Sequence, residues 1–265
     1  MSDDYAFTPG HAPLVVSIPH DGRDVPDAIA ARMSEVGRAL PDTDWHVRRL
    51  YGFATTLGAS VLAARWSRYV VDLNRPADDA ALYPGQVSTG ICPARTFGNE
   101  AIYADGGTVD AGERATRIER YWRPYHERLR RELEAVRERH GYALLWDAHS
   151  IRSEVPALFD GELPVLNVGT WDGRSCAATI EDALWAVASL APYSAVRNGR
   201  FTGGYTTRHY GRPAHGVHAV QLELAQRAYM DERTLRYDEP RGRALADTLR
   251  ALLRAYLESA HALYA

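Results

Sequence analysis

The sequence predicts an α/β fold in which a mainly parallel or mixed sheet carries helices on both faces. Short apolar runs alternate along the chain with longer helical patterns, which is the order of elements typical of such folds. The runs are almost uniformly hydrophobic, as strands buried on both faces are. Because 265 residues with 46% hydrophobic and 25% charged residues suit one large core, we predict a single domain over residues 1–265.

The N-terminal half is expected to begin with a buried strand, because the β-branched run LVVSI ends at Pro19. Asp44 is expected to cap the N-terminus of a helix that ends at Gly58. A Pro- and Gly-rich stretch follows that is long for a plain connection, so we predict a functional loop there. The predicted elements are strands at 14–18, 60–64 and 69–73, helices at 26–38 and 45–58, and the loop at 74–112.

The C-terminal half contains the clearest helix, a charged amphipathic segment that is expected to stop at Gly141. A Gly-rich loop, FTGGYTTRHYG, precedes an apolar run. The predicted elements are helices at 113–139, 180–190 and 239–264, strands at 142–146, 164–168 and 217–222, and the loop at 201–211.

Composition excludes several classes of function. All 31 basic residues are arginine, so a Schiff-base lysine and a phosphate-loop lysine are impossible. The formal net charge of −3 gives no indication of a nucleic-acid or anionic-membrane partner. Cys92 and Cys176 are too few for a disulfide framework or a cysteine-rich zinc site. Serine-hydrolase GxSxG and zinc HExxH motifs are also missing.

The N-terminal residues lack the apolar region of a secretory signal, and no run approaches the ~20 apolar residues that span a bilayer. We therefore expect a cytoplasmic protein without a membrane partner. The sequence carries no indication of an oligomeric state.

Residues of catalytic type follow several predicted strands, where ligand sites of open α/β sheets gather. His20 and His149 each follow an apolar run, in SIPHDG and LLWDAHS. One such histidine is commonly structural, but two at neighbouring strand ends indicate a divalent metal, because catalytic zinc often takes two histidines and a carboxylate.

The carboxylate ligand is expected from the segment PDTDW, with Asp44 preferred and Asp42 as the alternative. Asp147 lies two residues before His149 and would share its strand face. It can either orient a ligand histidine or bind the metal itself, and the residue pattern leaves both roles open.

Glu223 lies in the apolar run VQLELAQ. Burying a carboxylate there is costly unless it is paired or protonated, whereas a strand-end position beside a cleft explains it. A carboxyl group with a raised pKa beside an activated water suits general acid–base catalysis. We therefore predict that Glu223 is the catalytic acid–base group.

Two further segments suggest an acidic substrate. Asn74 and Arg75 end the run VVDLNRP, and the planar fork of arginine binds carboxylates through two hydrogen bonds. In the Gly-rich loop, Thr206, Thr207 and Arg208 add donors suited to a second carboxylate.

At this point the sequence resembles the N-formylglutamate amidohydrolase (N-formylglutamate deformylase) family of histidine breakdown, from about residue 12 to residue 230. The resemblance implies a phosphorylase/hydrolase-like fold, related to zinc carboxypeptidases and aspartoacylases. In those relatives an Asn–Arg pair holds the substrate carboxylate, and Asn74–Arg75 looks like that pair. The segments that carry the resemblance are SIPHDGRDVP, DTDWHVRRLYGFA, VVDLNRPADDAALYPGQ, LLWDAHSIRSEVPALFDGELPVLNVGT, FTGGYTTRHYG and HAVQLELAQRAYM.

The resulting hypothesis is an amidohydrolase that holds a divalent metal, zinc by preference, and cleaves a small acidic N-acyl amino acid. N-formyl-L-glutamate is the favoured substrate, with Arg75 and Arg208 each binding one of its carboxylates. Two alternatives stay open: a hydrolase of another acidic N-acyl amino acid, and a non-catalytic protein that only binds carboxylates.

Overall fold

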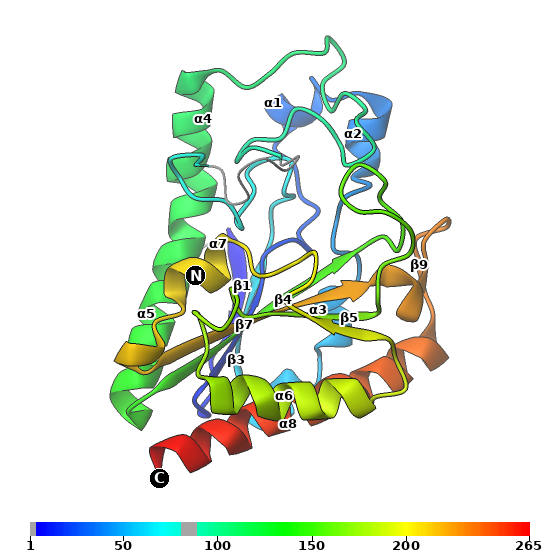
Figure 1. The fold of residues 1–265 in the computed structure, drawn as a ribbon. Helices are drawn as coiled ribbons and strands as arrows, with labels where there is room; N and C mark the ends of the chain where they lie inside the picture. Colours follow the sequence, from blue (N-terminus) through cyan, green and yellow to red (C-terminus); the bar gives the residue numbers. More distant parts are fainter. Residues whose placement is uncertain (1–3, 81–88) are drawn as a thin grey trace.

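The computed structural model describes residues 4–80 and 89–265. Its centre is a seven-stranded sheet with the order β1-β3-β2-β4-β7-β5-β6 (Figure 1). Strands β3, β2, β4 and β7 are parallel neighbours, β1 is antiparallel to β3, and β5 is antiparallel to β7 and parallel to β6. The predicted mixed, mainly parallel sheet is therefore confirmed. The strands are β1 (Tyr5–Thr8), β2 (Leu14–Ile18), β3 (Ser60–Ala64), β4 (Ala143–Ile151), β5 (Leu166–Gly169), β6 (Ala195–Arg197) and β7 (Val217–Ala225), and a separate pair β8 (Met230–Asp231) and β9 (Arg236–Tyr237).

Helices cover both faces of the sheet, as predicted. Along β2, Leu14, Val16 and Ile18 pack into one hydrophobic cluster, whereas Val15 packs into another on the opposite face. Figure 1 shows α6 and α8 together on one side of the sheet and α4 with α5 on the other. The α-helices are α1 (Asp27–Ala30), α2 (Glu35–Ala39), α3 (Val47–Leu50), α4 (Ala111–Arg117), α5 (Arg123–His140), α6 (Ala178–Leu190), α7 (Tyr205–Tyr210) and α8 (Glu239–Tyr264). The short elements η1 (Ala54–Leu57), η3 (Pro213–His215) and η4 (Gln226–Ala228) are 3₁₀ helices, and η2 (Ile118–Trp122) is a π-helix.

The long predicted helix is confirmed as the run α4–η2–α5. Asp110 caps it by accepting a hydrogen bond from the Glu113 backbone N–H at 2.8 Å. Gly141 ends it with a φ of 82°, which only glycine adopts readily. None of the helices in the described parts of the chain is long and apolar enough to cross a membrane. The single domain over residues 1–265 stays a prediction.

Two N-terminal helix predictions are wrong. The helix expected at 26–38 is two short helices, because Ser34 caps α2 through a 2.9 Å bond from the Gly37 N–H. The helix expected at 45–58 is the four-residue helix α3 followed by the 3₁₀ helix η1. Asp44 does not cap α3, because the capping position is His46, whose φ is 65°. The Asp44 carboxylate instead accepts from the backbone N–H of Ser150 on β4. The Asp44 side chain therefore bonds to a strand distant in sequence and not to the N-terminus of α3.

The strand predicted at 69–73 is also wrong. Tyr69, Val70 and Val71 are buried as a strand would be, but the segment forms turns. Arg117 donates to the carbonyls of Tyr69 and Val70 at 3.3 and 3.1 Å, so a side chain takes the place of a neighbouring strand. Strands β4 and β7, in contrast, extend beyond the predicted ends, so that His149 and Glu223 lie inside them.

Candidate active site

The carboxyl ends of β2, β4 and β7 bring three predicted residues together. His20 lies two residues beyond β2, and His149 on β4 is the register partner of Glu223 on β7. The segment that carries Asp44 is attached at the same edge, because the Asp44 backbone N–H donates to the His20 carbonyl at 3.0 Å. The sheet order therefore places these groups side by side, as strand-end polar residues of parallel strands are expected to lie.

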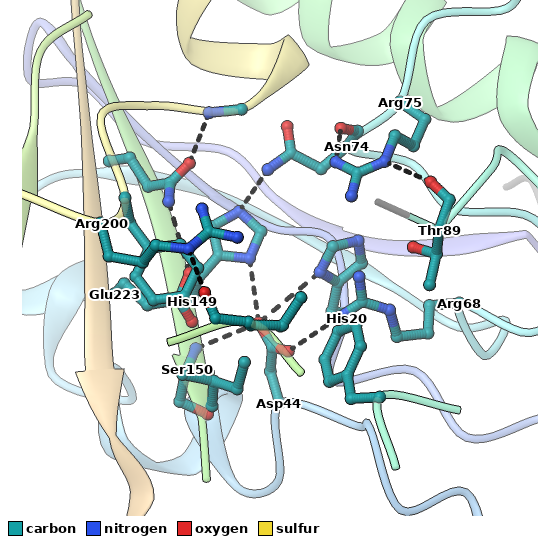
Figure 2. A pocket seen from close by; sticks show the side chains of 16 residues that line it. His20, Asp44, Arg68, Asn74, Arg75, Thr89, His149, Ser150, Arg200 and Glu223 are labelled. Atoms are coloured by element: carbon teal, nitrogen blue, oxygen red, sulfur yellow. Dashed lines mark hydrogen bonds and ion pairs between the residues drawn. The ribbon is translucent and has the colours of Figure 1, made fainter. Parts of the chain in front are cut away.

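His20, Asp44 and His149 form a compact buried group, which we call the ligand triad (Figure 2). One oxygen of Asp44, Oδ2, is 3.0 Å from His149 Nδ1 and 3.7 Å from His20 Nδ1. The two imidazole rings meet edge to face with centroids 4.9 Å apart. His20 Nδ1 is buried and has no hydrogen-bond partner among the described residues. The triad thus directs two ring nitrogens and a carboxylate oxygen at one point.

The opposite ring nitrogens face carboxylates. His20 Nε2 is 2.8 Å from Asp72 Oδ1, and His149 Nε2 is 3.2 Å from Asp147 Oδ1. At His20 the Asp72 carboxylate accepts a hydrogen bond, which favours hydrogen on Nε2 and leaves the lone pair on Nδ1. This is the usual arrangement behind metal-binding histidines. The donor set of the triad therefore fits a divalent metal.

The structure distinguishes between Asp42, Asp44 and Asp147, the carboxylates that the sequence left as alternative metal ligands. Asp42 lies outside the triad, where its Oδ2 accepts from Tyr69 Oη at 2.6 Å and from the Phe97 N–H at 2.8 Å. Asp147 lies behind His149 and also accepts from Thr207 Oγ1 at 3.3 Å. The carboxylate beside both histidines is Asp44.

The carboxylates beside the triad attract positive charge to His149, whereas burial and Arg68 lower the pKa of His20. Burial alone would raise the pKa of Asp44, but His20 and His149 outweigh it and lower that pKa. Burial also opposes a charge on His149, yet Asp147 and Asp44 raise its pKa well above the usual range. The carboxylates therefore attract positive charge to this point, whether a proton or a metal supplies it.

Arg68 and Asp72 complete the surroundings of His20, and neither is among the residues predicted from the sequence. Arg68 donates to Asp72 Oδ2 at 2.7 Å and lies 3.7 Å from Asp44 Oδ1. Burial would raise the pKa of Asp72, but Arg68 and His20 hold it well below its usual range. Asp72 lies in the apolar run VVDLN, which is the same kind of signal that identified Glu223.

Glu223 is the acid–base candidate of the site. Its side chain is buried, and burial raises the pKa of its carboxyl group to about 8. Gln221 donates to Glu223 Oε2 at 3.3 Å. A carboxyl group with this pKa can both take and give a proton near neutral pH.

A cavity of about 70 Å³ opens beside the triad, which is room for several waters. Arg75 is on its wall, where Nε donates to the Thr89 carbonyl at 2.9 Å and one terminal nitrogen donates to the Asn74 carbonyl at 3.3 Å. The lining residues are His20, Asp44, Arg68, Asn74, Arg75, Thr89, Phe97, His149, Ser150, Ile151, Leu158, Arg200, Phe201, Gly204, Gln221 and Glu223.

Asn74 connects the triad to the Gly-rich loop. Its Oδ1 accepts from the Thr206 N–H at 2.8 Å, which turns Nδ2 towards His149 Nε2 at 3.0 Å. His149 Nε2 thus lies between a donor, Asn74, and an acceptor, Asp147. A metal on Nδ1 places hydrogen on Nε2 and favours the bond to Asp147.

The other predicted substrate-binding residues are not on the cavity wall. Thr206 and Thr207 are fully buried, and Arg208 donates to the Gly203 carbonyl at 2.7 Å and to Thr202 Oγ1 at 3.2 Å. Arg200, which lies just before this loop motif, lines the cavity instead. No local pattern marks it among the many arginines of the chain.

The chain is similar to several known proteins. The family model described as N-formylglutamate amidohydrolase matches residues 12–230. The chain is similar to an N-formylglutamate deformylase of Pseudomonas putida, 51% identical with 95% of each chain covered. It is also similar to an N-formylglutamate deformylase of Pseudomonas aeruginosa, 50% identical with 98% of this chain and 96% of that protein covered.

Two solved structures are also similar. The crystal structure of N-formylglutamate amidohydrolase from Ralstonia eutropha JMP134 is 26% identical, with 97% of each chain covered and a TM-score of 0.81. A gene product of Agrobacterium tumefaciens shares the fold at 18% identity, with 96% of this chain and 95% of that chain covered and a TM-score of 0.74.

Proposed function

The chain belongs to the N-formylglutamate amidohydrolase family, and we propose that it hydrolyses the amide of N-formyl-L-glutamate to formate and L-glutamate. The observation that carries this proposal is the buried ligand triad beside Glu223, in a cavity that Arg75 also lines. A metal-type ligand group, an acid–base carboxyl group and a carboxylate-binding arginine are the parts that hydrolysis of an acidic N-acyl amino acid requires.

We propose that the ligand triad holds one zinc ion. Two nitrogens and one carboxylate oxygen are a common catalytic zinc set, although iron, manganese and cobalt accept the same ligands. When bound, the ion would supply Lewis acidity that lowers the pKa of a water and polarises the formyl carbonyl. His20 and His149 would bind through Nδ1, while Asp72 and Asp147 hold the hydrogens on Nε2.

Glu223 is proposed to move the proton. It takes a proton from the water as the oxygen of that water bonds to the formyl carbon. It then gives the proton to the amine nitrogen of glutamate as the carbon–nitrogen bond breaks. Its pKa of about 8 allows both steps near neutral pH.

Arg75 is proposed to bind a substrate carboxylate. Backbone carbonyls of Thr89 and Asn74 orient its guanidinium without cancelling its charge. Asn74 is proposed to position His149 and the Gly-rich loop, because its Nδ2 bonds to His149 and its Oδ1 accepts from the Thr206 N–H. Thr206 and Thr207 support this arrangement through their bonds to Asn74 and Asp147.

The test is formate release from N-formyl-L-glutamate by the purified protein, before and after chelation and after zinc is added back. We expect activity that is lost with the chelator and restored by zinc. No formate from a protein with stoichiometric metal would indicate another acidic N-acyl amino acid. No formate and no metal would contradict the mechanism and leave a carboxylate-binding protein.

A further inference from the structure

The cavity has an arginine on each of two opposite sides. Figure 2 shows Arg200 on the side where Glu223 and His149 lie, and Arg75 on the other side near His20. Arg200 belongs to residues 198–204, which connect β6 to α7. The substrate of the proposed reaction has two carboxylates, and a planar guanidinium can bind each of them through two hydrogen bonds.

The Arg200 side chain is held in a defined orientation. Its Nε donates to the Leu158 carbonyl at 2.5 Å, and its guanidinium lies 5.3 Å from the centre of the Phe201 ring. Leu158 and Phe201 are themselves residues of the cavity wall. An arginine oriented in this way loses less rotamer freedom when it binds a carboxylate than a mobile surface arginine would.

The backbone that carries Arg200 is also anchored. The Trp171 N–H donates to the Thr202 carbonyl at 2.5 Å, and the Gly204 N–H donates to Gln221 Oε1 on β7 at 2.7 Å. Arg208 contributes to this anchoring through its bonds to Gly203 and Thr202. Arg208 therefore positions the loop from behind, whereas Arg200 faces the cavity.

The positions of the two arginines suggest which carboxylate each one binds. Arg75 adjoins Asn74, which contacts the triad residue His149 at 3.0 Å. The α-carboxylate of the substrate lies on the carbon next to the scissile nitrogen, so it suits Arg75, whose chain neighbour Asn74 holds His149. The side-chain carboxylate lies two methylene groups further away. We propose that Arg200 binds this side-chain carboxylate and makes the site selective for glutamate over its neutral isostere; this rests on the proposed function.

The experiment compares kcat/KM for N-formyl-L-glutamate and N-formyl-L-glutamine, which differ only in the side-chain group, a carboxylate in one and a neutral amide of the same shape in the other. For Arg200→Met we expect a loss of about 100-fold on the glutamate compound and less than about threefold on the glutamine compound, since only the charged hydrogen bonds are removed. Arg200→Lys keeps the charge without the fork and should give an intermediate ratio. Arg254→Met, at an exposed position on α8, should leave both values unchanged.

Arg208→Met separates the two arginines of the loop. We expect this variant to lower kcat/KM for both substrates by the same factor, because it loosens the loop without removing a substrate contact. The inference is overturned if Arg208→Met abolishes the preference for glutamate while Arg200→Met retains it. It is also overturned if Arg200→Met lowers kcat/KM for both substrates equally while the variant unfolds at the same temperature as the wild type.

Calorimetric titration with L-glutamate and L-glutamine separates this inference from the proposed function. The wild type should bind L-glutamate more tightly, and Arg200→Met should bind the two alike. If the wild type discriminates through Arg200 but releases no formate, the inference stands and the proposed function fails. If formate is released and Arg200→Met keeps the wild-type preference in both assays, the proposed function stands and the inference fails.

Discussion

The residues of the active cavity are carried by two kinds of backbone, which we call the triad side and the recognition side after the residues they carry, whichever wall of the cavity these face. The triad side rests on the central sheet, with His149 and Glu223 paired across β4 and β7. The recognition side, with Arg75 and Arg200, rests on turns and loops whose backbone is held by hydrogen bonds to side chains and to other loops. A sheet fixes its side chains through a repeating ladder, whereas each loop contact is individual. The reacting groups and the recognition groups should therefore respond differently to substitution.

The largest expected effect is on the triad side. Glu223→Gln keeps the shape of the side chain but removes proton transfer, so kcat should fall by about 10³-fold. Zinc content and thermal unfolding should stay those of the wild type, which would show that the loss is chemical. Glu258→Gln, at an exposed position on α8, is the matched control and should be fully active. A kcat within tenfold of the wild type would remove Glu223 from the reaction.

The assignment of Asp44 as the metal ligand on the triad side is tested by comparing Asp44→Asn with Asp42→Asn. Asp44→Asn removes the charged oxygen that faces both histidines, so zinc affinity should fall by about 100-fold or more. Asp42→Asn should retain zinc, because Asp42 bonds to Tyr69 and Phe97 outside the triad. Zinc per chain after dialysis measures both. Loss of zinc in both variants, or only in Asp42→Asn, would contradict the assignment.

A glycine on the recognition side should affect catalysis without affecting the metal. A Cβ atom at Gly204 would lie 2.2 Å from Asn74 Nδ2, so Gly204→Ala must displace Asn74 or the loop. We expect kcat/KM to fall by up to about 100-fold, as misplacement by about 1 Å can cause. Gly112→Ala is the control, since its Cβ would meet nothing closer than 3.4 Å. If Gly204→Ala lost zinc while binding substrate normally, the two sides would not be separable.

The smallest effect concerns acid stability on the recognition side. His126 donates from Nε2 to the Leu73 carbonyl, just before Asn74, and burial lowers the pKa of His126 to about 3. Below about pH 6.5, His126 binds a proton in the unfolded chain but stays neutral in the folded protein. The free energy of unfolding therefore falls as the pH falls from 6.5 towards 3. The slope attributable to this residue is about 1.4 kcal/mol per pH unit.

His126→Gln should flatten this dependence. Chemical unfolding at pH 7 and pH 5.5 gives the free energies, and the difference between the two pH values is the relevant quantity, whatever the absolute stability of the variant. Equal pH slopes for the wild type and His126→Gln would show that His126 does not contribute.

The residues on the triad side were more predictable from the sequence than those on the recognition side. His149 and Glu223 follow from the strand pattern, because an apolar run that acquires polar residues near its end indicates the edge of a sheet. His20 follows from the same rule. Asp44 was one of two candidates, and contacts with residues distant in sequence, Ser150 and His149, distinguish it from Asp42.

The recognition side was less predictable. Residues 69–73 have the apolar pattern of a strand, but that pattern reports burial and not hydrogen bonding, and Arg117 supplies donors that a strand would otherwise provide. Arg208 lies in the Gly- and Thr-rich motif FTGGYTTRHYG, yet Arg200 reaches the cavity wall. Which arginine faces a cavity depends on the path of the loop, which no periodicity encodes.

The most direct test of the account is a crystal structure of the zinc-loaded protein with the metal located by its anomalous scattering. We predict one zinc ion bonded to Nδ1 of His20, Nδ1 of His149 and a carboxylate oxygen of Asp44, with Asp72 and Asp147 on the opposite ring nitrogens. Zinc bound through Nε2, zinc bound by Asp42, or zinc at another place in the chain would contradict it.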